Sequence, residues 1–250
     1  MSDKTVVVFV HGFMGSSKQF DELSAQLADS GLELLRHVLP GHERDAAYFI
    51  DSDAEQWQKS TNELIDSLRS QYDKIVLVGH SMGGLLAVRA AVACPDKICG
   101  IIGIGFPIKV LLRPIWLKHN MLAAKPYREG EDPRIGAARK LCGVKMNGRG
   151  DYFKTFPHSM QFLRIAKLTR RELPRLQVPL SVINFENDEI VSRGAKRFIE
   201  NALPTSSILM LKNSYHFLFA ADELKLMADE IKKAAALAVS DCQNKEGSLA

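Results

Sequence analysis

Residues 75–83 of the chain read Ile-Val-Leu-Val-Gly-His-Ser-Met-Gly. The apolar run predicts a buried strand, and the pattern of residues 83–93 predicts a helix directly after the turn. A Gly-x-Ser-x-Gly pattern alone is weak, but between a strand and a helix it holds a serine in strained backbone at the end of a sheet. The N–H groups that begin the helix also point toward developing negative charge. This setting favours Ser81 as a nucleophile over an incidental serine in a turn.

Strand-like and helical patterns alternate on both sides of this stretch. The predicted strands are residues 5–10, 32–39, 74–78, 98–105, 180–185 and 207–211. The predicted helices are residues 19–30, 54–70, 83–93, 195–202 and 222–239. Consecutively apolar strands separated by single helices indicate a parallel sheet covered on both faces. We therefore predict an α/β fold, with a mainly parallel sheet of about six strands flanked by helices, formed by residues 1–105 and 178–250.

Residues 106–177 interrupt this alternation and differ in composition. Prolines and glycines recur in the segment, and helical patterns occur at residues 111–118 and 159–168. The segment holds 16 Lys and Arg against 5 Asp and Glu, a formal charge of +11 within a chain whose total is +4. It leaves the carboxyl end of one predicted central strand and returns before the next, and the carboxyl edge is where sites on such sheets lie. We predict a basic, mostly helical cap above Ser81, with apolar side chains toward the site and most cations outward.

The composition is that of an ordinary globular protein. The chain has 250 residues, of which 46% are hydrophobic, and this excludes disordered and fibrous classes. The longest uncharged run, residues 75–88, is shorter than the roughly 20 apolar residues of a membrane-spanning helix. The amino terminus also lacks the apolar segment of a secretory signal. We expect no transmembrane segment and a cytoplasmic location.

The cysteines do not have the spacing of a zinc site or of a redox pair. They are Cys94, Cys99, Cys142 and Cys242. We expect neither a metal nor a cofactor.

A turn after the first predicted strand reads His11-Gly12-Phe13-Met14-Gly15. A turn at the carboxyl end of a strand can supply a backbone N–H group to an oxyanion, and with the N–H of Met82 it would form a hole with two donors. The alternative is a plain loop between a strand and a helix. His11 itself is interpreted as a residue that holds this loop.

A serine nucleophile needs a base, and the chain has seven histidines. Only His216 lies in the loop after the last predicted strand, from which it can reach a serine on a central strand. A neutral imidazole there can take the proton of Ser81 and return it to the leaving group.

An acid that orients the imidazole is expected after the predicted strand at residues 180–185. Three acidic residues compete in this loop. Asp188 precedes the apolar pair Ile190-Val191, which anchors the loop, so Asp188 is best placed to turn inward. Glu186 is the second candidate, and Glu189 is expected to face solvent.

Together these segments resemble the alpha/beta-hydrolase superfamily, in particular small bacterial carboxylesterases and monoacylglycerol lipases with a helical cap. The resemblance rests on His11-Gly12-Phe13, Leu39-Pro40-Gly41-His42, Gly79-His80-Ser81-Met82-Gly83-Gly84, Asn187-Asp188-Glu189-Ile190-Val191 and Ser214-Tyr215-His216. It implies Ser81 as nucleophile, Asp188 as acid, His216 as base, and Phe13 and Met82 as oxyanion donors. Residues 106–177 carry no family motif.

Two departures from the family pattern stand out. The usual leading antiparallel hairpin is missing, because the chain begins with the strand that carries His-Gly. The histidine motif is commonly Ser-Gly-His, and Tyr215 replaces that glycine here. The tyrosine narrows the pocket or alters the loop, but it leaves the base in place.

The leading functional prediction is a serine hydrolase that cleaves carboxylic esters of small acyl substrates through an acyl-enzyme. The entry of the cap offers an apolar wall for an acyl chain, and Tyr215 adds to the expected pocket. The alternative is that the apolar wall only packs the cap onto the core. The wall residues expected in the pocket are Phe106, Ile108, Leu111 and Trp116.

The basic segment is also compatible with other functions. The basic cap favours an esterase or thioesterase whose acyl group is attached to an anionic partner, such as an acidic acyl carrier protein or a lipid headgroup. The cations can equally form a solvated surface. A non-catalytic ligand-binding protein on the same scaffold is disfavoured because all three triad residues are present. No nucleic-acid partner is expected, since the segment has no recognisable binding motif.

Overall fold

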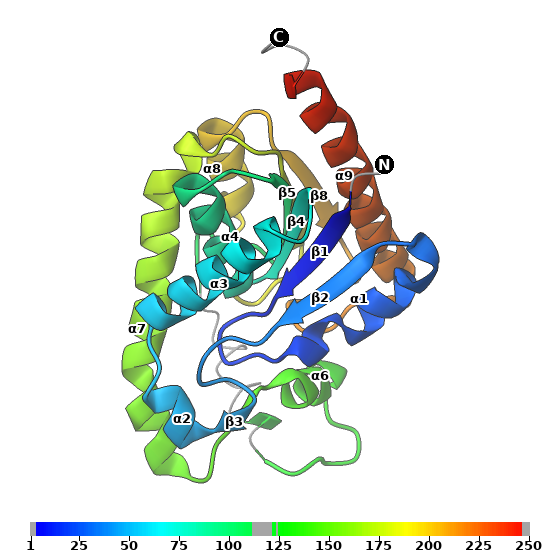
Figure 1. The fold of residues 1–250 in the computed structure, drawn as a ribbon. Coiled ribbons are helices and arrows are strands. Elements are labelled where there is room, and N and C mark those ends of the chain that lie inside the picture. Colours follow the sequence, from blue (N-terminus) through cyan, green and yellow to red (C-terminus); the bar gives the residue numbers. More distant parts are fainter. Residues whose placement is uncertain (1–3, 112–121, 124, 247–250) are drawn as a thin grey trace.

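The computed structural model describes residues 4–111, 122–123 and 125–246 (Figure 1). Six strands form one sheet in the order β2-β1-β4-β5-β7-β8, and every pair in it is parallel. The strands are β1 (Thr5–Val10), β2 (Glu33–His37), β4 (Lys74–His80), β5 (Ile98–Ile104), β7 (Leu180–Phe185) and β8 (Ser207–Leu211). The predicted α/β fold with a six-stranded sheet is confirmed.

The hydrophobic core lies on both faces of this sheet. Along β1, Val6, Val8 and Val10 belong to one cluster, whereas Val7 and Phe9 belong to the other. All five side chains are fully buried. A strand whose successive side chains alternate between two buried faces must be apolar at every position, as this one is.

Helices cover the two faces unequally (Figure 1). The first cluster is closed by α3 (Ala54–Arg69), α4 (Met82–Ala93), α7 (Arg149–Glu172) and α8 (Gly194–Ala202). The second is closed by α1 (Asp21–Gln26) and α9 (Ala221–Glu246). Short 3₁₀ helices span Ser17–Phe20, Ala28–Ser30 and Leu173–Arg175.

The segment predicted as a cap contributes α6 (Pro133–Leu141), β6 (Val144–Lys145) and α7. β6 pairs with β3 (Arg44–Asp45), which leads into α2 (Ala46–Ile50). The long helix α7 contacts α2, α3 and α4, and its Ile165 and Ala166 lie in the main core cluster. The second half of the segment therefore packs as part of the helical layer.

The carboxyl ends of the parallel strands share one edge of the sheet. The turns after β1, β4, β7 and β8 carry the residues that the sequence predicts to be functional. The segment between β5 and β7 also leaves from this edge. In parallel sheets this edge is where ligands bind.

Candidate active site

Ser81 forms the turn between β4 and α4. Its backbone has φ 52° and ψ −121°, a conformation that a residue other than glycine adopts only when its surroundings enforce it. The Ser81 N–H donates to the carbonyl of Ile104 at 2.8 Å, and its carbonyl accepts from the N–H of Gly84 at 3.0 Å. The Ser81 side chain lines a large cavity. The structure thus holds this serine in strained backbone at the sheet edge.

Gly83→Ala should destabilise the protein by about 3 kcal/mol. A Cβ at Gly83 would lie 1.9 Å from the carbonyl oxygen of Val10 in β1, which cannot move without disturbing the sheet. Gly148→Ala is the matched control, because no atom lies within 4 Å of its added Cβ and its φ of 179° is open to any residue. Urea unfolding measures both variants, and equal stability would contradict the close packing of this turn.

Asp188 and His216 contact each other directly. His216 Nδ1 donates to Asp188 Oδ2 at 2.9 Å, and both side chains are buried. Asp188 Oδ1 accepts the N–H groups of Ile190 at 2.7 Å and Val191 at 2.8 Å. Burial alone would raise the pKa of Asp188, but His216 and the two N–H groups outweigh it and hold this pKa below its ordinary value. Asp188 is therefore an oriented carboxylate.

The other ring nitrogen of His216 is available. Nε2 is buried and has no hydrogen-bond partner among the described residues. The His216 ring lies against Gly105, where an added Cβ would be 3.2 Å from Cε1. The Ser81 N–H donates to the carbonyl of the preceding residue, Ile104, so the backbone of the serine and the ring of the histidine both lie near the end of β5. A buried imidazole nitrogen without a partner near a serine is able to accept its proton.

Three buried histidines hold the loops around the serine. His11 Nε2 accepts the N–H of Leu39 at 3.0 Å, and His42 Nε2 accepts the N–H of Met14 at 3.2 Å. His80 Nε2 donates to the carbonyl of His216 at 2.9 Å. Burial lowers the pKa of His11 to about 3, of His42 to about 4 and of His80 to about 3. These imidazoles are therefore neutral structural groups near neutral pH.

Two backbone N–H groups lie next to Ser81 without an acceptor. Gly12 N donates to Gln19 Oε1 and Met14 N donates to His42, but the intervening N–H of Phe13 has no acceptor among the described residues. The N–H of Met82 begins α4 and likewise has none in the described part of the chain. An added Cβ on Gly12 would lie 3.0 Å from Ser81 Cβ, so the Phe13 loop passes close to the serine.

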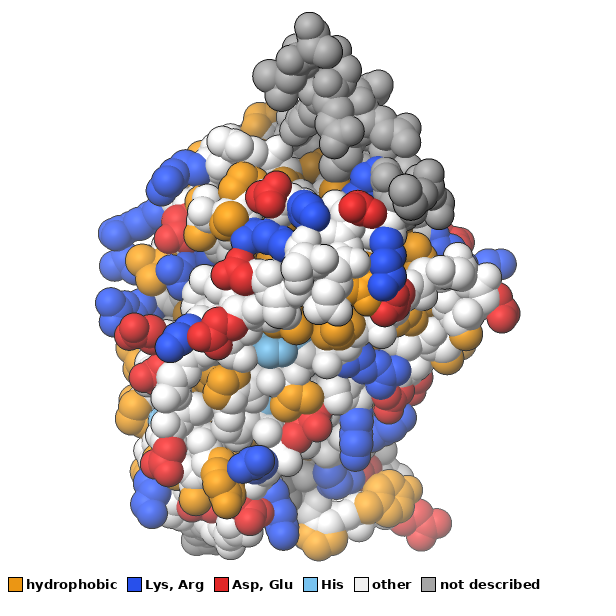
Figure 2. Space-filling view, viewed as in Figure 1, with side chains coloured by type: hydrophobic (Ala, Val, Ile, Leu, Met, Phe, Trp, Pro, Cys, Tyr) orange, Lys and Arg blue, Asp and Glu red, His pale blue; other side chains and the backbone are white. Residues whose placement is uncertain are grey.

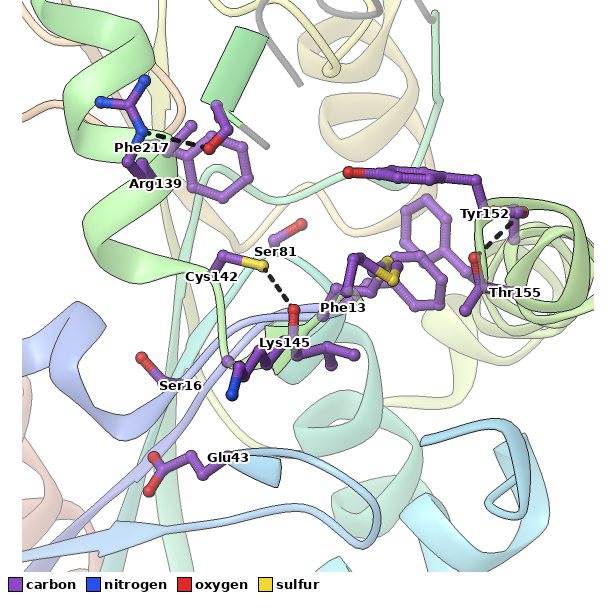
Figure 3. A pocket seen from close by; sticks show the side chains of 18 of the residues that line it. Phe13, Ser16, Glu43, Ser81, Arg139, Cys142, Lys145, Tyr152, Thr155 and Phe217 are labelled. Carbon is purple, nitrogen blue, oxygen red and sulfur yellow. Dashed lines mark hydrogen bonds between the residues drawn. The ribbon is translucent and has the colours of Figure 1, made fainter. Parts of the chain in front are cut away.

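A cavity of about 1450 Å³ opens at Ser81. Figure 3 shows Ser81 in its middle, with Phe217 to one side and Tyr152 and Thr155 of α7 to the other. Most of the wall is apolar: Phe13, Met14, Val144, Met146, Phe156, Phe162, Leu163, Ile190 and Phe217. Polar and charged side chains line another part: Ser16, Lys18, Glu43, Arg44, Asp45, Arg139, Lys140 and Lys145.

The apolar wall predicted from the sequence is not the wall of this cavity. Phe106 and Ile108 are fully buried in the main core cluster, because the chain continues its apolar run inward after β5. Leu111 is 53% exposed. Tyr215 is half-buried, and none of these four described residues lines the cavity around Ser81. Trp116 lies outside the described residues.

The loop that carries Asp188 departs from one expectation. Glu186 is exposed, whereas Glu189, predicted to face solvent, is buried. Glu189 Oε2 accepts the N–H of His216 at 3.4 Å, and Oε1 lies 3.5 Å from Nη1 of Arg134 in α6. The partner from α6 is more than fifty residues away in the chain, so no local pattern indicated this burial.

Within the described ranges, no cluster of three or more His, Cys, Asp or Glu side chains has the geometry to hold a metal ion. None of the described helices combines the length and the apolar character that crossing a membrane requires.

Known proteins resemble this chain in sequence and in fold. The chain is 29% identical over 217 residues to a thermostable monoacylglycerol lipase of Bacillus sp. (strain H-257), covering 84% of this chain and 82% of the relative. Its fold is similar to that of a protein from a study of two metagenome-derived lipolytic enzymes, with TM-score 0.69, 22% identity and coverage of 96% and 94%. It is also similar to a monoacylglycerol lipase of Paleococcus ferrophilus, with TM-score 0.66, 20% identity and coverage of 91% and 94%.

The match to the family itself covers most of the chain. Residues 7–230 match the Alpha/beta hydrolase family, a range that begins in β1 and ends in α9. It includes the strained serine turn, the acid loop and the histidine loop. With its six-stranded parallel sheet and this match, the chain belongs to the alpha/beta hydrolase family.

Proposed function

We propose that the protein is a serine hydrolase that cleaves carboxylic acyl esters with Ser81, His216 and Asp188. The observation that carries the proposal is the buried 2.9 Å contact between His216 Nδ1 and Asp188, which leaves Nε2 without a partner beside a strained serine. Ester-hydrolysing relatives of the family support the same chemistry.

The reaction proceeds in two halves. His216 Nε2 takes the proton of the Ser81 hydroxyl while Oγ attacks the acyl carbonyl, and the imidazolium then protonates the departing alkoxide. This breaks the ester bond and leaves the acyl group on Ser81. In the second half, water gives its proton to His216 and attacks the acyl-enzyme, which releases the acid and restores the Ser81 hydroxyl. The N–H groups of Phe13 and Met82 stabilise the oxyanion in both halves.

The cavity supports a monoacyl ester of a small polyol as the substrate. Its apolar wall suits an acyl chain, and the polar residues nearby suit an alcohol group that must be hydrogen-bonded. Two of the similar proteins are named monoacylglycerol lipases. A volume of about 1450 Å³ exceeds that of a typical pocket for a small ligand, which is about 300–1,000 Å³.

The test of this function is labelling followed by a substrate series. A fluorophosphonate probe should label the wild-type protein, and mass spectrometry should place the label on Ser81. Aryl esters and monoacylglycerols of increasing chain length, run beside acyl thioesters, should show esters as the preferred class and longer chains accepted. A protein that neither reacts with the probe nor turns over any ester is the non-catalytic scaffold protein.

A lipid surface is the anionic partner that the described residues favour over an acidic carrier protein. Phe153, Phe156 and Met160 of α7 are 81%, 65% and 54% exposed, and Phe156 also lines the cavity. Exposed cations line the same cavity: Lys18, Arg44, Lys140 and Lys145. Apolar side chains beside cations suit the headgroup region of an anionic membrane.

Further cations of residues 106–177 lie away from this cavity or make part-buried contacts. Arg164, Lys167 and Arg171 lie on the exposed side of α7, where Figure 2 shows Lys and Arg side chains gathered along the left edge. Arg139 pairs with Glu131 and donates to backbone carbonyls. Reversal of such paired arginines would disturb the fold, so a test of docking must use the exposed side chains.

Phe153→Ser with Met160→Ser should weaken binding to vesicles of phosphatidylglycerol and phosphatidylcholine by about tenfold, because two apolar side chains no longer enter the lipid. Hydrolysis of a soluble short-chain ester should be unchanged. Leu226→Ser is the control, since Leu226 is 48% exposed on α9, which covers the other face of the sheet. Vesicle sedimentation measures binding, and equal binding of wild type and double variant would remove the lipid surface from the proposal.

An acyl group on an acidic carrier protein would depend on the cations instead. Salt-sensitive hydrolysis of such a carrier, unaffected by the Phe153 and Met160 changes, would favour the carrier protein over the membrane.

A further inference from the structure

Arg134 is the residue of α6 that reaches the loops of the acid and the base. It lies in the first turn of the helix, where the Asp132 side chain caps the helix by accepting the Arg134 N–H at 2.9 Å. The same carboxylate accepts Arg134 Nε, with both oxygens at 3.0 Å. A guanidinium held by a carboxylate two residues away has a fixed direction.

The guanidinium points to Glu189, the neighbour of Asp188 in the chain. Arg134 Nη1 lies 3.5 Å from Glu189 Oε1, and the Glu189 side chain is only 8% exposed. The other carboxylate oxygen accepts the backbone N–H of His216 at 3.4 Å. Glu189 therefore joins the loop of Asp188 to the loop of His216, and Arg134 places a cation beside its buried carboxylate.

Arg134 also contacts the base loop from a second side. Its guanidinium carbon lies 4.9 Å from the centroid of the Tyr215 ring, the distance of a cation–π contact. Tyr215 directly precedes His216. Tyr215 occupies the position where a glycine is common in this motif. Its ring thus packs against the guanidinium of Arg134.

We propose that Arg134 is a positioning residue, which holds the loops of Asp188 and His216 in register through Glu189 and Tyr215. The inference rests on the proposed function of the Ser81 site. It makes α6 part of the support of the active site, because the contact connects the segment between β5 and β7 to the turns after β7 and β8.

The contacts around His216 set the consequence of losing Arg134. Among the described residues, Asp188 binds the ring at 2.9 Å, His80 lies against it with ring centroids 5.0 Å apart, and Glu189 accepts its backbone N–H. Loss of Arg134 releases Glu189 and Tyr215 from the guanidinium, so the backbone at His216 is held less firmly.

Arg134→Gln should lower kcat by about tenfold with KM changed less than about twofold, because a loosened base is misplaced while the cavity is intact. Glu189→Gln should have the same effect, and the double variant should be no worse than either, since the two residues act through one contact. Arg89→Gln is the control. It removes a half-buried pair of similar kind, with Glu172 at 2.9 Å, and should leave kcat unchanged.

Two substitutions of Tyr215 separate positioning from a general loss of structure. Tyr215→Phe keeps the ring and should behave as wild type, whereas Tyr215→Leu should show the loss in kcat. Thermal unfolding of each variant identifies those that fail to fold. If Arg134→Gln or Glu189→Gln is among them, the two Tyr215 variants test the proposal from the loop of His216.

The outcomes are distinct. Wild-type kcat in Arg134→Gln and Tyr215→Leu, or additive losses in the double variant, would overturn the positioning role. A wild-type protein that neither labels with a fluorophosphonate nor hydrolyses esters would instead overturn the proposed function itself.

Discussion

Ser81→Ala should lower kcat for ester hydrolysis by about 10⁶-fold, as expected when the nucleophile of such a triad is removed. The fluorophosphonate label should be lost at the same time. The reason is that His216 Nε2 then has no hydroxyl to deprotonate, although the Asp188 contact is retained. The change removes one oxygen and keeps the Cβ, so the turn should fold as before. Steady-state kinetics and probe labelling are the measurements.

Ser67→Ala is the control for this prediction. Ser67 is a surface serine of α3 whose hydroxyl bonds within its own helix, to the carbonyl of Leu64. Both labelling and turnover should be unchanged in it. Turnover of an activated ester at the wild-type rate by Ser81→Ala would eliminate Ser81 as the nucleophile.

Asp188→Asn should lower kcat by about 10⁴-fold. Asp188 Oδ1 accepts two backbone N–H groups, so the oxygen of an asparagine would occupy that position and its NH₂ would face His216. A donor at this place requires Nδ1 to be unprotonated, which puts the ring proton on Nε2. That tautomer cannot accept the proton of Ser81.

Glu186→Gln is the matched control for Asp188→Asn, because Glu186 is an exposed acid of the same loop. Its kcat should remain near that of wild type. The pKa of Asp188 is held below its ordinary value, so the carboxylate is ionised throughout the neutral and mildly acidic range, and the asparagine defect should persist at every pH there. If Glu186→Gln lost more activity than Asp188→Asn, the assignment of the acid would be wrong.

Much of the fold follows from local pattern. Strands such as β1 and β7 have the predicted bounds because their apolar residues are continuous and end at turn residues. The sequence predicts a helical pattern only at residues 159–168, whereas α7 spans Arg149–Glu172 and contains Pro157, a residue type that removes a backbone hydrogen bond within a helix. The pair of β3 and β6 joins residues 44 and 144, and nothing in either short segment indicates the other.

The candidate site was likewise predictable only in part. Ser81, Asp188 and His216 were assigned from motifs at strand ends, and parallel strands bring such ends to one edge; their catalytic roles stay predictions. The cavity wall was not predictable, because its residues come from separate segments whose packing no motif specifies. Phe106 was predicted to line the pocket because it follows β5, but the chain after β5 continues into the hydrophobic core.

Phe162 belongs both to the cavity wall and to the hydrophobic core. It lines the cavity, lies in the main core cluster and stacks on Phe13 with ring centroids 5.6 Å apart. Truncation of a buried Phe to Ala lowers the free energy of unfolding by about 3–5 kcal/mol, which is a large share of the total for a typical domain. Evolution toward bulkier substrates at this position would therefore require a compensating change elsewhere. Leu163 and Met146 of the wall are only partly buried, so under the proposed function they are the positions where a substitution can alter the fit of an acyl chain at little cost in stability.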